Sequence, residues 1–509
     1  MRGDPAAQYL GWAFYRLEPG WHVPLTWTTR LGYPAGTSIA LLDSIPLVAV
    51  LLRPLAPLLP EPFQYLGLYA AVALTLQAYF GIRLCQQMCE GDRLFTAIGG
   101  LLFLVSPAVT WRVFGHFALA SHWLLLASLA YYVRPTAAMT TTRWLAPFVV
   151  VLALAGGIHP YLAVLSLLIA IAAVGRLALE RRCGWGRAAL LAGGLAAVTA
   201  GSTVLFGFAP GFDRESYAAS GWGYFSLNLL APINPMREGS LFLPALPLAT
   251  DGQYEGYNYL GFGVIALLVV NLVRAPRSLR WLGGSLALPL VVLSVACTLA
   301  ALSSTITLGS HTLLHVALPR PLEFVAESFR ASGRLFWPVH YLLVLAAVVL
   351  TYRLWRPPWR EALVAIALVL QIADEWGQSR VSRASFDRPV TNPLRAERWS
   401  TLGTDHERLM VIPPALCPDA LGGHDGFLIF GGLAAAQRMA TNTYAPARAG
   451  QAALHLHCTD LPARVRRGEL EPRAAYVVDD QTRAALDSAR TSSHRCAALD
   501  GFNLCTRTP

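Results

Sequence analysis

Residues 161–179 read YLAVLSLLIAIAAVGRLAL, a run of nineteen residues whose only charged side chain is Arg176. This is close to the roughly 20 apolar residues that a helix needs to cross a lipid bilayer. The whole chain has a matching composition, because its mean hydropathy is +0.45, 55% of its 509 residues are hydrophobic and only 14% are charged. These values predict a polytopic membrane protein and exclude an ordinary soluble domain.

Similar apolar runs follow one another along the chain and predict a mainly α fold. Roughly ten of them are long enough, or nearly so, to form a transmembrane helical bundle over residues 61–379. The boundary at 156–160 rests only on Gly156, Gly157 and Pro160, and a further run at 40–57 is interrupted by Pro46 and Arg53, so we expect that run to lie in the interface or to re-enter. The runs lie at about 63–84, 94–111, 116–133, 144–159, 161–179, 188–207, 258–273, 281–304, 335–354 and 360–373.

The formal net charge is +10, and every basic residue counted in it is an arginine. The arginines are concentrated in alternate loops between the apolar runs, and the positive-inside rule makes these loops cytoplasmic. The loops 111–116, 208–257 and 305–334, the N-terminal segment and everything after residue 374 then face outward. Because the arginines form no single patch, the charge does not indicate a nucleic-acid partner.

The N-terminal segment, residues 1–60, interleaves aromatic with polar residues and shows no cleavable signal peptide. Aromatic rings with polar tips favour the bilayer–water interface. We expect an extracytoplasmic lid of short interfacial helices that carries two candidate catalytic carboxylates, Asp4 and Asp43. An outward N-terminus needs a means of translocation, and the sequence favours a missing first helix over translocation by the later helices.

Residues 380–509 differ in composition and predict a small extracytoplasmic α/β domain. Strand-like pieces lie at 408–412, 475–479 and 502–507, with helical segments at 431–440 and 480–490. Cys417, Cys458, Cys496 and Cys505 predict two disulfides of open connectivity, since no CxxC spacing supports zinc. The remaining cysteines, which we expect to be free thiols, are Cys85, Cys89, Cys183 and Cys297.

Polar residues gather where this topology places the outer ends of the helices. Ionisable groups near membrane depth are costly, so they usually line a watered cavity or pair with one another. We therefore predict an outward-facing polar pocket, to which the loop residues Asp213, Arg214 and Glu215 also lie close. The candidate substrate- and phosphate-binding residues are Arg112, His116, His159, Tyr254, Glu255, Asn258, Arg330 and Arg334, and His122 and Tyr161 lie at the same level.

Arg330 and Arg334 stand four residues apart, one turn of a helix, and would both address one phosphate. A nearby carboxylate would accept the proton of an acceptor hydroxyl. This chemistry suits the transfer of a sugar from a lipid-phosphate carrier.

Plainer interpretations stay open for each of these residues. The two arginines could reach lipid headgroups, Asp4 and Asp43 could cap helices, and Glu255 could merely pair with an arginine. We expect the histidines to be hydrogen-bonded packing groups rather than metal ligands. Asp374 and Glu375 would form a solvated helix end.

Several short motifs resemble those of a bacterial family of polytopic membrane proteins, DUF6311, which is grouped with the GT-C superfamily of glycosyltransferases. The resemblance runs from residue 3 to about 390. It is carried by Gly3-Asp4-Pro5, Gly11-Trp12, Phe14-Tyr15-Arg16, Ser38-Ile39, Asp43-Ser44-Ile45-Pro46-Leu47, Phe63-Gln64-Tyr65, Arg112, Gly115-His116, His122-Trp123, Glu255-Gly256-Tyr257-Asn258-Tyr259-Leu260-Gly261 and Phe329-Arg330-Ala331-Ser332-Gly333-Arg334.

The resemblance implies a GT-C-like enzyme that uses a polyprenyl-phosphate sugar at the outer membrane face. GT-C enzymes carry a first helix followed by an outer loop with a catalytic Asp or Glu, a role that falls on Asp4, with Asp43 as second choice. The chain lacks that first helix before Asp4. Most such relatives need no metal, although some use a divalent cation.

We therefore expect a glycosyltransferase of the bacterial inner membrane whose acceptor is a cell-surface glycan, a lipid or a protein. A lipid or polysaccharide transporter is the first rival, but it would need repeat symmetry or polar groups through the bilayer midplane, and the sequence shows neither. A non-catalytic partner that binds glycan or another envelope protein is the second.

Overall fold

The computed structural model describes residues 3–90, 92–137, 139–208, 221–236, 239–274, 284–319, 326, 328–386, 392–489 and 494–508. Asp213, Arg214 and Glu215 lie outside these ranges. The chain divides into two compact units. We call residues 67–203 and 218–387 the helical unit, and residues 1–66, 204–217 and 388–509 the sheet unit.

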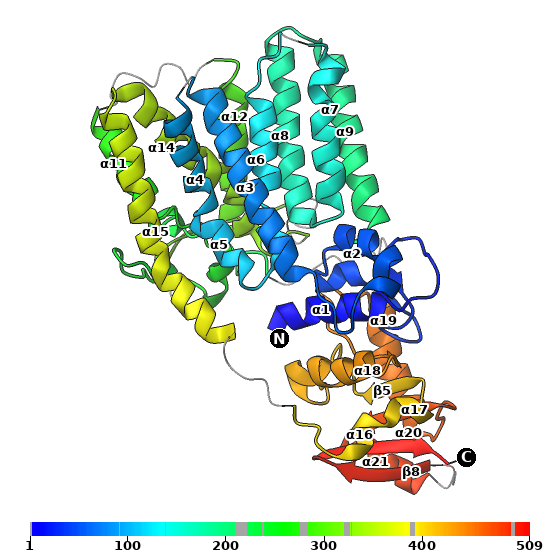
Figure 1. The fold of residues 1–509 in the computed structure, drawn as a ribbon. Coiled ribbons are helices and arrows are strands. Elements are labelled where there is room, and N and C mark those ends of the chain that lie inside the picture. Colours follow the sequence, from blue (N-terminus) through cyan, green and yellow to red (C-terminus); the bar gives the residue numbers. More distant parts are fainter. Residues whose placement is uncertain are drawn as a thin grey trace. The chain divides into compact units, whose positions relative to one another are not determined.

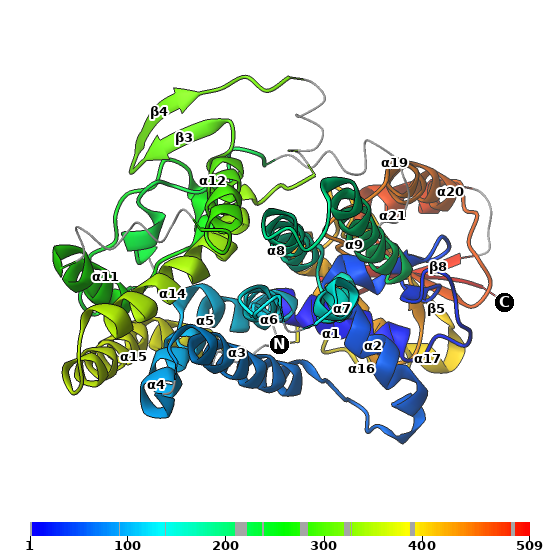
Figure 2. The same ribbon diagram turned by 90° about the horizontal axis from the view of Figure 1, so that it is seen from above.

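In the described part of the helical unit, each predicted apolar run coincides with a helix or a pair of helices (Figure 1 and, from above, Figure 2). The predicted boundary near residue 156 is confirmed, because one helix ends at Gly156 and the next begins at Pro160. The helices are α3 (Leu66–Met88), α4 (Arg93–Leu104), α5 (Pro107–Val113), α6 (Trp123–Tyr132), α7 (Thr141–Gly156), α8 (Pro160–Leu179), α9 (Trp185–Leu205), α11 (Phe262–Arg274), α12 (Leu288–Leu302), α14 (Trp337–Leu354) and α15 (Trp359–Phe386).

The number of spans is smaller than predicted. Among the described residues, Leu66–Met88, Pro160–Leu179, Trp185–Leu205 and Ser332–Leu354 are long and apolar enough to cross a membrane. The pair α4 and α5, bent by 50°, makes a possible fifth span. Helices such as α7, α11 and α12 are apolar but have only 10–17 residues, so roughly ten full spans are not confirmed. At 1.5 Å per residue, they fall short of a bilayer core about 30 Å thick.

The prediction of a solvated helix end at Asp374 and Glu375 is wrong, because α15 continues past them to Phe386. Asp374 is only 1% exposed and accepts hydrogen bonds from the Tyr259 hydroxyl at 2.7 Å, the Phe262 N–H at 2.9 Å and the Leu241 N–H at 3.1 Å. The neighbouring Glu375 accepts one from the Thr110 hydroxyl at 2.7 Å. The prediction was wrong because this carboxylate anchors the irregular segment before α11 and therefore has to be buried.

The sheet unit holds a five-stranded sheet in the order β6–β5–β7–β9–β8, which confirms a small α/β fold. β5 runs parallel to β6 and β7, while β9 is antiparallel to β7 and β8. The strands are β5 (Arg408–Ile412), β6 (Ala440–Thr441), β7 (Ala474–Val478), β8 (His494–Leu499) and β9 (Phe502–Arg507). Disulfides join Cys417 to Cys458 and Cys496 to Cys505, and the other four cysteines are free, as predicted. Such bonds are typical of an extracytoplasmic location.

Both faces of this sheet are covered, which explains why β5 and β7 are apolar at successive positions. Leu409 and Val411 face one core, and Met410 and Ile412 face the other. The second core is closed by α20 (Leu461–Arg466) and α21 (Asp480–Ser488). The first is closed by the π-helical turn Phe427–Gly431, by α18 (Gly432–Ala436) and by α1 (Gly3–Tyr15).

The N-terminal segment is therefore part of the sheet unit, whereas the sequence separated residues 1–60 from 380–509. Leu10 and Phe14 of α1 belong to the same buried cluster as Trp399 and Phe430. Trp12 and Tyr15 are also buried, so these aromatic residues are core side chains rather than interfacial anchors. The predicted interruption at 40–57 is confirmed by three short helices, η1 (Ile39–Leu42), α2 (Pro46–Leu52) and η2 (Arg53–Leu58).

If α1 is part of the core, shortening one of its buried side chains should destabilise the sheet unit. We expect Phe14→Ala to destabilise the sheet unit by about 3–5 kcal/mol, the usual cost of removing a buried phenylalanine. Amide hydrogen exchange in β5 and β7 of the detergent-purified protein should accelerate by about a hundredfold or more. The control Leu58→Ala, at a side chain that is 82% exposed, should leave these rates unchanged. Unchanged exchange in Phe14→Ala would show that α1 does not support the sheet.

Candidate functional site

Three predicted pocket residues of the helical unit meet in one buried cluster, Arg112, Glu255 and Arg334, which we call the arginine–glutamate cluster. The Oε2 atom of Glu255 accepts from Nη1 of Arg112 at 2.8 Å and from Nη2 of Arg334 at 2.8 Å. Nε of Arg334 donates to the same oxygen at 3.1 Å, and Nη2 of Arg112 donates to the Glu255 carbonyl at 3.0 Å. All three residues are less than 10% exposed. Two guanidinium groups thus share one carboxylate.

Short elements separated widely in sequence bring these side chains together. Arg112 is carried by α5, Glu255 by η6 (Asp251–Gly256) and Arg334 by η8 (Ser332–Phe336). The two 3₁₀ helices meet backbone to backbone, because a Cβ atom on Gly333 would collide with Cα of Gly256. The missing side chain of Gly333 permits this approach, and a Cβ atom on Gly256 would collide instead with the Ser226 carbonyl.

Asn258 holds this junction together rather than facing an open pocket. Its side-chain amide donates to the carbonyls of Gly256 and Gly333, both at 3.1 Å. The Asn258 carbonyl in turn accepts from Nδ1 of His340 at 3.2 Å, if that nitrogen carries the proton. Asn258 is fully buried. Asn258 thus fixes the backbone that carries Glu255, and its substrate-binding role stays a prediction.

Aromatic rings flank the cluster. The guanidinium carbon of Arg112 lies 5.6 Å from the ring centre of Trp337, and that of Arg334 lies 5.0 Å from the ring centre of Tyr161. The Tyr161 hydroxyl accepts a hydrogen bond from the Ala331 N–H at 2.8 Å, which fixes the ring beside η8. Such cation–π contacts contribute roughly 0.5–2 kcal/mol each and restrict the orientation of the guanidinium planes.

The electrostatics of the cluster determine what Glu255 can do. Burial raises the pKa of Glu255, but the charges of Arg334, Arg112 and His116 and the hydrogen bond from Arg334 lower it further, so it lies well below its usual range. A carboxylate this acidic stays ionised and does not act as a proton acceptor near neutral pH. Among the described residues, two arginines in the cluster share one glutamate. It therefore suits an anion rather than acid–base chemistry.

The predicted pair of arginines is divided by the start of η8. The helix begins at Ser332, and Arg330 lies before it, so the two arginines do not occupy one helical turn as predicted. Arg330 is exposed, and its guanidinium carbon lies 4.9 Å from the Phe225 ring. The rings of Tyr224 and Tyr254 nearby are 46% and 45% exposed. Arg334 is thus the buried cation, and Arg330 is the solvent-facing one.

The histidines are built into the packing. His159 caps α8, because its Nδ1 accepts from the Tyr161 N–H at 3.2 Å. Burial and the positive charge of Arg334 lower the pKa of His159 well below its usual value, so the ring is neutral. His122 Nδ1 lies 2.7 Å from the Tyr341 hydroxyl. His116 contributes to the field at Glu255. His122 and His159 thus make hydrogen bonds within the packing, and the substrate-binding role of His116 and His159 stays a prediction.

The described residues hold one group of three side chains with metal-ligand chemistry, Asp487, His494 and Cys496. Cys496 is bonded to Cys505, so it offers no thiolate. This group does not fit a metal centre.

Asp4 and Asp43 belong to the sheet unit, whereas the arginine–glutamate cluster belongs to the helical unit. Asp4 is exposed in the first turn of α1. Asp43 ends η1 in the left-handed conformation, with φ of 54°, and its N–H donates to the Ala40 carbonyl at 3.2 Å. The convergence of the two acids with the arginines at one hollow stays a prediction.

Fold and site together define a membrane protein with a buried cationic cluster in a bundle of apolar helices and a disulfide-bonded α/β unit. Family models then identify the chain more closely. A model described as domain of unknown function DUF6311 matches residues 1–376, and a model of the DUF6311 C-terminal domain matches residues 398–507. The chain belongs to the DUF6311 family, which confirms that part of the resemblance.

Two solved structures from Archaeoglobus fulgidus are similar to this chain. One is the archaeal oligosaccharyltransferase AglB in complex with an inhibitory peptide and a dolichol-phosphate, with a TM-score of 0.43, 10% identity and coverage of 94% of this chain and 66% of that chain. The other is an oligosaccharyltransferase in the apo form, with a TM-score of 0.38, 11% identity and coverage of 87% and 61%. This chain therefore spans less than two thirds of either structure. A comparison with the curated proteins finds no match.

The shared carboxylate should be essential to the helical unit. Glu255→Gln would leave two buried guanidinium groups facing each other, so we expect a loss of about 3–5 kcal/mol of stability. Thermal unfolding in detergent measures this. The matched control Glu407→Gln removes an acid that pairs with Arg473 on the surface, and it should cost less than about 1 kcal/mol.

The stabilisation that Glu255 provides should weaken as the pH becomes acidic. Because the folded pKa of Glu255 is depressed, its stabilisation is present above the unfolded pKa of about 4.3 and is lost as the pH falls through the folded value. The difference in unfolding temperature between wild type and Glu255→Gln should therefore be constant at neutral pH and shrink below about pH 4. A difference that grows on acidification would contradict the ion-paired arrangement.

Proposed function

We propose that this protein is a membrane glycosyltransferase that transfers a sugar from a polyprenyl-phosphate donor to an extracytoplasmic glycan, lipid or protein. The observation that carries the proposal is the arginine–glutamate cluster, in which two buried arginines share one carboxylate within a unit of apolar helices. A buried positive charge is costly in such surroundings and is retained where it serves an anionic group. The phosphate of a lipid carrier is an anion delivered at membrane depth.

The cluster favours phosphate over other anions because of arginine's shape. A guanidinium group presents a planar fork of donors that matches phosphate oxygens in pairs. Glu255 occupies one edge of each guanidinium and holds both in a fixed orientation. The solvent-facing Arg330 would meet the donor first, and Arg334 would stabilise the departing phosphate. Preorganised charge of this kind is a large contribution to catalysis.

In the reaction, the bond between the sugar's anomeric carbon and the phosphate oxygen breaks, and the phosphate leaves with the electron pair. The acceptor oxygen forms the new bond to that carbon, and its proton passes to a carboxylate base. Glu255 is unsuited to this role because its pKa is so low. By the family resemblance, Asp4 is the first candidate for the base and Asp43 the second. A divalent cation is compatible with this scheme, but no step requires one.

Turnover of lipid-linked sugars tests the proposal. The full-length protein, purified in detergent, would be incubated with a panel of polyprenyl-phosphate sugars, and sugar release and transfer would be measured. We expect release by wild type and a loss of at least about a hundredfold in Asp4→Asn, with donor binding retained, because a general base contributes 10²–10⁴-fold. Arg330→Gln should weaken donor binding. Asp405→Asn, which alters an exposed acid paired with Arg398, is the matched control and should keep full turnover.

Other outcomes decide between the rivals. Release by both wild type and Asp4→Asn would remove Asp4 as the base and direct the test to Asp43→Asn. Release by neither protein would favour a transporter or a non-catalytic glycan-binding partner. Movement of the same lipids across proteoliposomes would then separate these two.

A further inference from the structure

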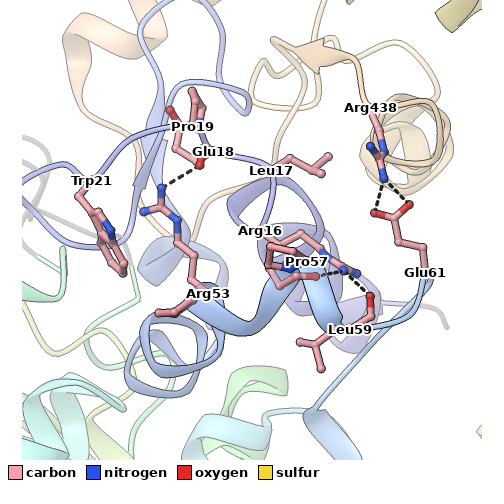
Figure 3. Close-up of a pocket in the computed structure, with 12 residues that line it drawn as sticks. Arg16, Leu17, Glu18, Pro19, Trp21, Arg53, Pro57, Leu59, Glu61 and Arg438 are labelled. Carbon is pink, nitrogen blue, oxygen red and sulfur yellow. Dashed lines mark hydrogen bonds and ion pairs between the residues drawn. The ribbon is translucent and has the colours of Figure 1, made fainter.

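The sheet unit contains a cavity of about 650 Å³ that the proposed reaction does not use. Figure 3 shows Arg53 beside Trp21, Arg16 near the middle, and Arg438 with Glu61 on the other side. The residues that line it lie between Arg16 and Glu61, apart from Arg438 of the C-terminal domain, and all belong to the sheet unit. Three arginines in one cavity of ligand size need an explanation, because ligand pockets typically measure about 300–1,000 Å³.

Arg53 is held in place but is not neutralised. Its Nη2 donates to the carbonyl of Glu18 at 2.8 Å and also to that of Gly20. Its guanidinium carbon lies 4.3 Å from the ring centre of Trp21 and 4.8 Å from that of Tyr15. The residue is only 8% exposed, and its Nη1 is buried without a hydrogen-bond partner among the described residues. An unused donor on a buried cation points to a missing acceptor.

Arg16 is held in a similar way. Its two terminal nitrogens donate to the carbonyls of Ala56, Leu59 and Pro60 at 2.9–3.0 Å. In the described part of the chain, neither Arg16 nor Arg53 forms an ion pair with a carboxylate. Carbonyl oxygens satisfy donors but supply no full negative charge. Both guanidinium groups therefore keep their charge at the cavity.

The acidic residues of the cavity are already engaged elsewhere. The carboxylate of Glu18 accepts from the Thr28 hydroxyl at 2.8 Å and from the Thr29 N–H at 2.7 Å, and it lies 3.1 Å from Nε2 of His22. Burial raises its pKa, but these hydrogen bonds lower it further, so Glu18 stays ionised within its own network. Both carboxylate oxygens of Glu61 accept a hydrogen bond from Nη2 of Arg438, each at 3.0 Å.

The apolar part of the cavity indicates more than a bare anion. Trp21 is 54% exposed, and Pro19, Pro54 and Pro57 line the cavity with it. An exposed indole presents a flat apolar surface with a polar edge, which suits the face of a sugar ring. We propose that this cavity binds an acidic saccharide, a sugar bearing a carboxylate or a phosphate, with its anionic group at Arg16 and Arg53 and its ring against Trp21. This inference does not rest on the proposed transfer reaction.

Calorimetric titration of the detergent-purified full chain tests it with four probes: glucuronate, glucose 1-phosphate, glucose and inorganic phosphate. We expect both acidic sugars to bind at least about tenfold more tightly than glucose or phosphate, since hydrogen bonds to charged groups contribute about 1.5–3 kcal/mol. Equal affinity for phosphate and glucose 1-phosphate would overturn the saccharide part of the proposal. Binding of none of the probes, or equal binding of glucose, would overturn it entirely.

Two variants locate the binding. Trp21→Ala changes an exposed ring, and Arg53→Lys keeps the charge but loses the fork; each should weaken the acidic sugars by about tenfold or more. Arg473→Gln, an exposed arginine of the same unit outside the cavity, is the matched control and should bind normally, with all unfolding temperatures compared. If Arg330→Gln lowers the affinity and Trp21→Ala does not, the acidic sugar binds in the helical unit and the proposal fails. That result would leave the proposed function standing.

Discussion

The helical unit depends on one carboxylate that two guanidinium groups share. Removing a charge from water costs several kcal/mol, and Arg112 and Arg334 are both almost fully buried. Without Glu255, each cation would raise the cost of burying the other. With it, the three residues tie α5, η6 and η8 into one arrangement, since Glu255 contacts Arg112 through both its side chain and its carbonyl. The glycine contact between η6 and η8 and the bridging amide of Asn258 serve the same junction.

The sheet unit is organised differently, around apolar burial. Its β5 strand has no polar face, because helices cover both sides of the sheet. One of those helices, α1, lies almost four hundred residues earlier in the chain than β5. The N-terminal segment therefore packs with the C-terminal domain, and a membrane surface is not needed to explain the buried rings of Trp12, Phe14 and Tyr15. The entropic cost of closing a loop grows only slowly with the length of the loop. The large sequence separation between α1 and β5 therefore does not prevent their contact.

Local patterns explain which parts of this structure were predictable. Apolar runs marked the helices, short strand-like runs marked β5, β7 and β9, and an even number of outward cysteines marked the disulfides. Contacts between residues far apart in the sequence have no such local pattern. Arg112 and Glu255 are 143 residues apart, and nothing in either neighbourhood indicates the other. The same holds for α1 in the core of the sheet unit, and for Asp374, whose partners are set by the path of the segment before α11.

The two buried arginine sites differ in a way that bears on function. In the arginine–glutamate cluster, a carboxylate pairs directly with both guanidinium groups and fixes them, which suits a group that arrives and departs. Around Arg53 and Arg16, backbone carbonyls and aromatic rings fix the groups, and their full charge remains. A site for a departing phosphate must not hold its product too tightly, whereas a site that retains a glycan has no such constraint. A direct ion pair to the guanidinium groups at the first site, and carbonyl partners for Arg16 and Arg53 at the second, fit this difference.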